Sequence, residues 1–363
     1  SALTHQYNSI AIYNNSWGPA DDGQTLIGPG PLTLAALEDG VTNGRGGRGN
    51  LYLWAAGNGL QYSDNVNYDG YANSRFTIAV GAVDYNGVQA YYSEPGAAMF
   101  ITAPSRATSA VGITTTDRLG ANGYSSTDCT SQFGGTSSAS PLAAGAVALM
   151  LQANPNLGWR DVQHILAQTA VKNNPTDSGW ITNTAGFHLN HKYGFGRIDA
   201  GAAVTAAGTW VNVAPATSAS SNVIAVNQTI PDNNSTGVTS SVVIPDNIKL
   251  EHVEVVFSAT HLYRGNLRVV LTAPSGTQSV LAETRADGGD NYASWKFMTV
   301  RNWGESSAGT WSLKVTDGAG GNVGTFDSWQ LILHGTPLPS GPTNTPSNTP
   351  TATSTATPSN TPT

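Results

Sequence analysis

The sequence predicts an α/β domain built on a parallel sheet, followed by an all-β sandwich. In residues 1–205, short apolar strands alternate with helical segments, which is typical of a parallel sheet covered by helices. In residues 223–337, apolar and polar residues alternate with period two between turn residues, which indicates a sandwich. A length of 363 residues leaves room for two or three domains.

The first domain is expected to contain short buried strands at Ile10–Tyr13, Leu51–Trp54 and Phe76–Val83. A helix is predicted over Pro31–Asn43, between the first two strands. The run Leu142–Leu151 is apolar on every face, which predicts a fully buried helix. The segment Trp159–Thr169 has an amphipathic pattern and is predicted to form a further helix.

The second domain is recognised by apolar side chains at every other position. These are Leu267, Val269 and Leu271, then Trp311, Leu313 and Val315, then Trp329, Leu331 and Leu333. Residues 206–222 are small and predict a connector between the domains. Residues 338–363 form a Thr/Pro-rich tail that cannot bury a core, which predicts a disordered linker or O-glycosylated stalk.

The composition excludes some classes of function. A net charge of -7 argues against nucleic-acid binding, which favours a basic stripe. No run of eighteen apolar residues exists, so no membrane span is predicted. Only 11% of the residues are charged and 41 are glycine, as in secreted or cell-surface proteins. We expect a monomer, and the start at Ser1 without Met predicts a chain that is cut at its beginning.

The string Gly134–Pro141 places serines in a turn of small residues directly before the apolar helix. Small neighbours let a substrate backbone come close, and the helix N-terminus offers free amides to a developing oxyanion. The string therefore suggests a catalytic serine. An ordinary helix N-cap is the alternative, because Ser and Thr are preferred there.

Several strings together resemble the kexin and furin branch of the subtilisin-like serine proteases. The matching strings of the first domain are Tyr13–Gly23, Gly44–Gly47, Trp54–Gly59, Tyr92–Glu94, Gly134–Pro141, Asn156–His164 and Tyr193–Gly196. The matching strings of the second domain are Tyr263–Gly265, Trp295–Thr299 and Gly309–Trp311. The resemblance implies the C-terminal part of a subtilisin-like catalytic domain over 1–205 and a jelly-roll-type P domain over 223–337.

The resemblance implies that Ser137 is the nucleophile and that Asn58 donates its side-chain amide to the oxyanion. Without Ser137, Asn58 would be interpreted as a turn residue. The substrate is expected to lie as an added strand along Ser16, Trp17 and Gly18. Two further positions, Ala55 and Gly57, are also implied in substrate binding.

The resemblance also assigns four acidic residues. It places Asp21 and Asp69 in the pocket for a basic side chain before the scissile bond, which suits a guanidinium. It places Asp21, Asp64 and Glu94 around a calcium ion, because hard cations prefer carboxylate oxygens. Without the resemblance, each of these acids would be interpreted as a solvated charge on a loop.

The chain departs from the family pattern in three ways. The triad Asp and His precede the serine in this fold, and no histidine here matches that base, so the 363 residues are expected to be almost inert. The single cysteine, Cys129, matches a family cysteine whose partner is expected in the missing part. Ile27 is apolar where relatives that demand a basic residue four positions before the cut carry a carboxylate.

The predicted function is that of a calcium-dependent serine endopeptidase that cleaves polypeptides after Arg or Lys. One alternative is a catalytically silent surface-binding protein that uses the sandwich and stalk. The other is a subtilase of broad, apolar specificity.

Overall fold

The computed structural model describes residues 2–107 and 111–338. A parallel sheet forms the centre of the first domain, with its strands in the order β1 (Ile12–Asn15), β2 (Leu51–Ala55), β3 (Thr77–Val83) and β4 (Ile101–Pro104). The three predicted strands are confirmed to within two residues. The fourth was not predicted because it is short and ends in proline, and proline cannot donate to a ladder.

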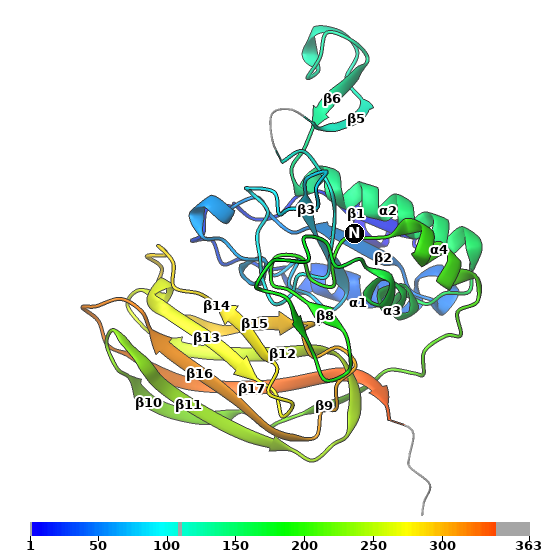
Figure 1. Ribbon diagram of the computed structural model, residues 1–363. Coiled ribbons are helices and arrows are strands. Elements are labelled where there is room, and N and C mark those ends of the chain that lie inside the picture. The colour runs from blue at the N-terminus through cyan, green and yellow to red at the C-terminus, as the bar shows by residue number, and fades with distance from the viewer. Residues whose placement is uncertain (1, 108–110, 339–363) are drawn as a thin grey trace, which may run out of the picture.

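The helices of the first domain are α1 (Pro31–Gly47), α2 (Thr136–Ala153), α3 (Trp159–Thr169) and α4 (Ala200–Gly208). The backbone of α1 leaves helical geometry at Gly44–Gly46, so its regular part ends where the sequence predicted. Helix α2 packs against all four strands of the sheet and against α4 (Figure 1). This packing fixes the N-terminus of α2, and with it Ser137, over the sheet.

The prediction that α2 is buried on every face is wrong for the residues that the structure describes. Ala143, Val147 and Met150 face the sheet and are buried, whereas Leu142 and Leu149 are 38% and 50% exposed. A continuous apolar run does not distinguish a helix covered on all sides from one covered on a single face.

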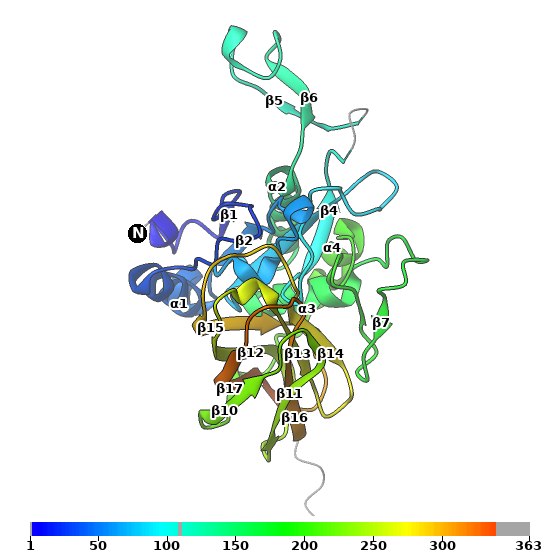
Figure 2. The same ribbon diagram turned by 90° about the vertical axis from the view of Figure 1, so that its left-hand side faces the viewer.

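Two hairpins and several short 3-10 turns complete this part of the chain. Strands β5 (Ile113–Thr116) and β6 (Cys129–Phe133) pair and extend away from both domains, as Figures 1 and 2 show. Strands β7 (Ile181–Thr182) and β8 (His188–Leu189) form the second hairpin. The 3-10 turns are η1 (Ala2–Thr4), η2 (Leu60–Tyr62), η3 (Val66–Tyr68), η4 (Gly120–Asn122) and, in the second domain, η5 (Arg264–Asn266).

The second domain is a sandwich of two antiparallel sheets. One sheet contains β10 (Ile224–Ile230), β17 (Gly324–Pro337), β12 (Ile248–Thr260) and β15 (Tyr292–Thr299), with β9 (Thr217–Ser220) also paired to β17. The other contains β11 (Asn234–Ile244), β16 (Gly309–Asp317), β13 (Leu267–Thr272) and β14 (Gln278–Ala282).

The alternating side chains of the sandwich point inward as predicted. All nine of the residues that carried the prediction are at most 1% exposed and belong to one apolar core. The predicted connector is not entirely loop, because α4 ends within it and β9 is also part of it. The sandwich is confirmed, and jelly-roll connectivity stays a prediction. The predicted tail lies outside the described residues from 339 onward.

The two domains share a buried junction. The ring of Trp303, which follows β15, is fully buried and packs edge-on against Phe100 and Phe195 of the first domain. Arg160 of α3 donates from Nε to Glu251 Oε2 of β12 at 2.8 Å, and His164 Nε2 lies 2.7 Å from Glu251 Oε1. Burial alone would raise the pKa of Glu251, but the hydrogen bonds from His164 and Arg160 outweigh burial and lower it to about 2.

Replacement of Glu251 by Gln is expected to destabilise the chain by about 3 kcal/mol at neutral pH, because it leaves Arg160 buried without an acid. A lowered carboxyl pKa gives stability that is present above the unfolded value of 4.5 and is lost as pH falls toward about 2. Urea unfolding of the two proteins should therefore give free energies that converge near the folded-state pKa. A difference that is the same at both pH extremes would contradict this assignment.

Candidate functional site

Ser137 is the second residue of α2 and lines a cleft of about 690 Å³. The residue before the helix, Gly135, has φ of 78°, a left-handed conformation that favours glycine. This turn brings the first amides of α2 to the cleft, where they have no partner within the helix. The position of Ser137 fits a nucleophile beside a ready site for an oxyanion.

Hydrogen bonds from residues at the ends of β1 and β4 and from Tyr92 hold the turn that carries Ser137. Ser16 Oγ, just beyond β1, donates to the Ser137 carbonyl at 2.9 Å, and Ser140 Oγ donates to Asn14 Oδ1 at 2.7 Å. On the other side, the Gly135 amide donates to the Tyr92 hydroxyl at 3.0 Å. Ser105 Oγ, beyond β4, donates to the Gly135 carbonyl at 2.8 Å. The turn is therefore fastened at both ends.

Asn58 lies in the turn after β2 and lines the same cleft. Its Oδ1 accepts from the backbone amide and the hydroxyl of Thr136, at 2.8 and 3.0 Å. Its Nδ2 donates to Asp21 Oδ2 at 3.2 Å, which uses one of the two amide hydrogens. The anchored Oδ1 fixes the amide plane, and in this orientation the Nδ2 is directed to Asp21 and keeps one further hydrogen to donate.

The proposed substrate strand follows β1 directly. The ring of Trp17 packs on Trp54 and Tyr71, and the Trp17 carbonyl accepts from Trp54 Nε1 at 2.7 Å. Among the described residues, the backbone N–H and C=O of Gly18 have no hydrogen-bond partner. These free groups can pair with an extended peptide. A Cβ at Gly18 would stand 2.9 Å from Asp69 Oδ2, so a larger residue there would require that carboxylate to shift.

Four predicted acids line one small cavity of about 10 Å³. They are Asp21, Asp64, Asp69 and Glu94, and the wall also includes Gly57. A Cβ at Gly57 would stand 2.2 Å from Glu94 Oε1, so the missing side chain leaves room for the Glu94 carboxylate. The predicted substrate residue Ala55 ends β2 and is buried, and it does not line this cavity or the cleft.

The acids of the cavity are poorly compensated. Burial raises the pKa of Asp64 to about 6 and that of Asp69 to about 7, and Asp21 contributes to both shifts by repulsion. Burial and the charges of Asp64 and Asp21 raise the pKa of Glu94. Backbone amides provide the direct donors, such as Gly23 to Asp64 at 2.9 Å and Gly59 to Glu94 at 2.9 Å. An accumulation of ionised carboxylates without a bound partner favours a cation.

Carboxylate oxygens are suitable ligands for calcium, so the chemistry of this cavity fits a hard cation. Among the described residues, however, no three His, Cys, Asp or Glu side chains are arranged as a ready ligand set. The structure thus brings Asp21, Asp64 and Glu94 to one cavity without forming the predicted coordination sphere.

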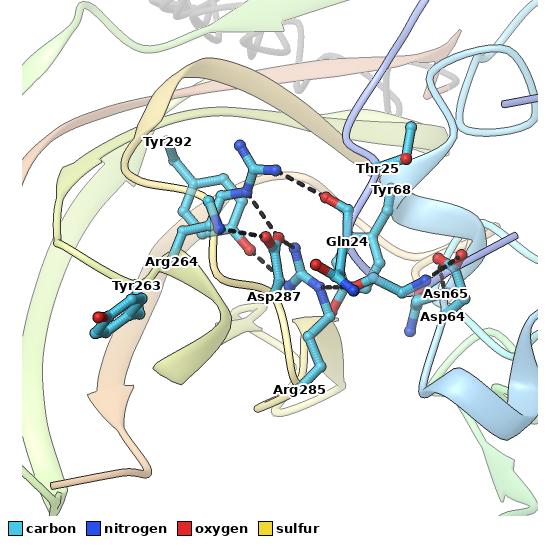
Figure 3. Close-up of polar contacts among 12 residues, drawn as sticks. Gln24, Thr25, Asp64, Asn65, Tyr68, Tyr263, Arg264, Arg285, Asp287 and Tyr292 are labelled. Carbon is cyan, nitrogen blue, oxygen red and sulfur yellow. Dashed lines mark hydrogen bonds and ion pairs between the residues drawn. The ribbon is translucent and has the colours of Figure 1, made fainter. Parts of the chain in front are cut away.

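The sandwich contacts the segments around this cavity through a buried arginine, Arg285 (Figure 3). Arg285 Nε donates to the Gly23 carbonyl at 2.8 Å, and its guanidinium lies 3.7 Å from the centre of the Tyr68 ring. Asp287 pairs with both Arg285 and Arg264, and Arg264 also donates to the Gln24 carbonyl at 2.8 Å. The loop that carries Asp21 is therefore held from the second domain.

None of the chain's seven histidines is hydrogen-bonded to the Ser137 hydroxyl, and all seven lie within the described residues. Four of them are hydrogen-bonded elsewhere through a ring nitrogen: His164 to Glu251, His191 to Val280, His261 to Asp317 and His334 to Glu254. The single cysteine, Cys129, is exposed and free. Within the described part of the chain, no helix is both long and apolar enough to cross a membrane.

Sequence reasoning did not assign roles to several residues around the cleft. Tyr92 and Ser105 hold Gly135, and Tyr124 and Phe133 bring the β5–β6 hairpin to the cleft wall. Tyr92 belongs to a matched string, which was the available signal for it. The others follow no local pattern and depend on long-range packing.

Comparison with protein families identifies both domains. Residues 2–196 match the model of the subtilase family, and residues 250–333 match that of the proprotein convertase P-domain. The chain is 42% identical over 346 residues to human proprotein convertase subtilisin/kexin type 7, covering 92% of this chain and 44% of that protein. It is 40% identical over 359 residues to a dibasic-processing endoprotease of Schizosaccharomyces pombe, covering 95% of this chain and 49% of that protein.

The fold also matches a solved structure. A serine protease of Aeromonas sobria, solved in complex with its chaperone, superposes with a TM-score of 0.81 and 23% identity. That match covers 90% of this chain and 71% of the protease chain. The chain spans about half the length of the curated relatives described above.

Proposed function

Because the chain belongs to the subtilase family, we propose that its site serves a serine endopeptidase that cleaves polypeptides after a basic residue. The observation that carries the proposal is the placement of Ser137 and Asn58 on one cleft, with the cavity of four carboxylates directly behind Asn58. The free backbone of Gly18 supports binding of the substrate as an added strand.

In the proposed mechanism, Ser137 Oγ attacks the scissile carbonyl carbon while a histidine base removes its proton. The carbonyl π electrons move to the oxygen, and Asn58 Nδ2 and the Ser137 amide stabilise that oxyanion. When the intermediate collapses, the C–N bond breaks and the amine leaves with the proton returned by the base. None of the seven histidines described above is hydrogen-bonded to Ser137. We therefore propose that turnover requires a base other than these seven histidines.

The proposed specificity comes from the carboxylates. Asp69 is half-buried beside Gly18, and Asp21 lines the same small cavity, so a guanidinium or ammonium that approaches these two carboxylates would compensate both. Ile27 is 54% exposed and its backbone pairs with Asp69 in a bridge. Because its side chain is apolar, it offers no charge to a basic substrate residue four positions before the cut. The proposal therefore includes tolerance at the position four residues before the cut.

Replacement of Asp69 by Asn is expected to lower kcat/KM on arginyl substrates by about tenfold to a hundredfold, because one charge-assisted contact is lost. The measurement is cleavage of a peptide library by the longest active form of the protein. Ile27→Asp is the matched comparison, and it should instead add preference for a distal Arg. Equal cleavage by the unmodified protein after Leu or Phe would overturn basic specificity and favour a broad subtilase.

We also propose that calcium binds at Asp21, Asp64 and Glu94. The support is the shared cavity and the raised pKa values of Asp64 and Glu94, which come first from burial and then from repulsion by the neighbouring acids. Calcium would supply positive charge that lets these carboxylates ionise together. These three carboxylates do not yet form a complete ligand set, so calcium binding would require the loop that carries Asp21 to move.

Removal of calcium with a chelator is expected to lower Tm, and more so at about pH 7.5 than at about pH 5. A carboxyl pKa raised by folding makes the folded state less stable as pH rises from the unfolded value near 4 toward about 6 for Asp64. Calcium binds the ionised form, so its stabilisation grows over the same interval. Calorimetry of the chain and of Glu94→Gln tests this, and an equal calcium effect in both would contradict the site.

We propose that the protein is secreted or displayed at a cell surface and that it acts as a monomer. Its low content of charged residues and high glycine content support this setting.

A further inference from the structure

A second pocket, of about 460 Å³, opens at the junction of the two domains and shares no lining residue with the cleft at Ser137. The first domain contributes residues of the β7–β8 region, including Thr184, and also His191. The sandwich contributes the turn between β13 and β14, including Ser275, together with Gln278, which is the first residue of β14, and Arg301 after β15. We refer to this space as the Arg301 pocket.

Arg301 is a buried cation without an acid. It is 5% exposed, and among the described residues the only hydrogen-bond partner of its guanidinium is the Gln278 carbonyl, which accepts from Nε at 2.9 Å. Its Nη1 is fully buried with no hydrogen-bond partner among the described residues. The two other buried arginines of the described chain each pair with a carboxylate, Arg160 with Glu251 and Arg285 with Asp287.

An unpaired buried charge is costly, because the lost hydration is not replaced. Burial lowers the pKa of the Arg301 guanidinium to about 10, so it still carries its positive charge at neutral pH. A bound anion would supply the missing partner. The planar guanidinium offers paired N–H groups that match the oxygens of phosphate, sulfate or carboxylate.

His191 adds a donor to the same pocket. Burial, together with the charges of Arg301 and Arg268, lowers the pKa of His191 to about 3, so its ring is neutral at physiological pH. Its Nε2 accepts from the Val280 amide at 3.1 Å, which places the ring proton on Nδ1. No described residue accepts from this N–H, so it can donate to a ligand.

The hydroxyl groups of the wall do not compensate Arg301. Thr184 Oγ1, Thr277 Oγ1 and Ser275 Oγ donate to Glu305 at 3.0, 2.7 and 2.8 Å. Glu305 also accepts from Asn302 Nδ2 and forms no ion pair with Arg301. The acid of this region is thus satisfied by neutral donors, and the guanidinium is left for another partner.

We propose that the Arg301 pocket binds a small tetrahedral oxyanion, phosphate or sulfate, through the Arg301 guanidinium and His191 Nδ1–H. Because residues from both domains line the pocket, the bound anion fastens the β7–β8 region to the sandwich. This site is independent of the proposed protease activity, and its test requires no catalysis.

The experiment is isothermal titration of the 363-residue chain with inorganic phosphate, sulfate and chloride at matched ionic strength. Phosphate or sulfate should bind saturably and chloride should not. Arg301→Met is expected to weaken binding by at least about tenfold, because the charged donors are lost. Arg268→Met removes the same charge from a half-exposed pair with Glu283 that is not part of the pocket lining, so it should weaken binding much less than Arg301→Met does.

Two outcomes of the titration would overturn the proposal. They are absence of saturable binding of either oxyanion to the unmodified chain, and equal weakening of binding by the two variants. Thermal unfolding gives a second measurement that does not depend on Arg301→Met being well folded. Phosphate or sulfate should raise the Tm of the unmodified chain beyond the effect of chloride at the same ionic strength. An equal Tm in the three salts contradicts the site.

Discussion

Replacement of Asn58 by Leu is expected to lower kcat for peptide hydrolysis by about 10²–10³-fold and to change KM little. Leucine has a similar size but cannot donate a hydrogen bond to the oxyanion, which forms only after attack by Ser137. Steady-state kinetics of the longest active form of the protein on an arginyl peptide provide the measurement.

A structural effect has to be separated from loss of the donor, because Asn58 Oδ1 also anchors Thr136. Thr136→Val is the matched control, since it removes one of these two anchoring bonds and leaves the Asn58 amide intact. We expect this variant to lose less than about tenfold in kcat, as for one neutral hydrogen bond. Equal losses in the two variants would show that Asn58 acts only by holding the turn.

Replacement of Arg285 by Met is expected to destabilise the chain by about 3–5 kcal/mol, because it leaves Asp287 buried with one of its two cations removed. The Arg285 and Asp287 side chains are 0% and 1% exposed. The substitution also removes the donor to the Gly23 carbonyl and the cation over the Tyr68 ring. Urea unfolding of the 363-residue chain measures the change in free energy.

The control is again Arg268→Met, whose ion pair with Glu283 is 41% and 50% exposed and is worth at most about 1 kcal/mol. Hydrogen exchange adds a local measurement. The Gly23 amide, which donates to Asp64, should exchange faster in Arg285→Met than in the control. A loss of stability no larger than that of Arg268→Met would exclude Arg285 as the buried link between the domains.

The sequence predicted those features that have a local pattern. Period-two alternation identified the inward side chains of the sandwich, since each strand has one buried face. The small-residue string located Ser137 at the start of α2. The family resemblance assigned Asp21, Asp64, Asp69 and Glu94 to neighbouring sites, and the structure brings them to a common cavity. Each of these inferences uses residues that are close in the chain or a matched string.

Contacts between distant segments could not be predicted in this way. Arg285 and Gly23 are 262 residues apart and meet only because the sandwich packs on the first domain. That Arg301 has no acidic partner can be seen only once the positions of the neighbouring acids in the structure are known. The exposed face of α2 was also missed, because an apolar run does not reveal what covers each side.

The hydrogen bond from Asn58 to Asp21 connects recognition with reaction chemistry. In the described structure Asp21 holds one hydrogen of the amide that is proposed to stabilise the oxyanion. A basic substrate side chain would take over Asp21, and both Nδ2 hydrogens of Asn58 would then be available as donors while Thr136 still holds its Oδ1. A neutral side chain would leave one of these two hydrogens on Asp21, so an incorrect peptide could bind and still react more slowly. Selectivity would then be expressed in the rate of bond cleavage as well as in affinity.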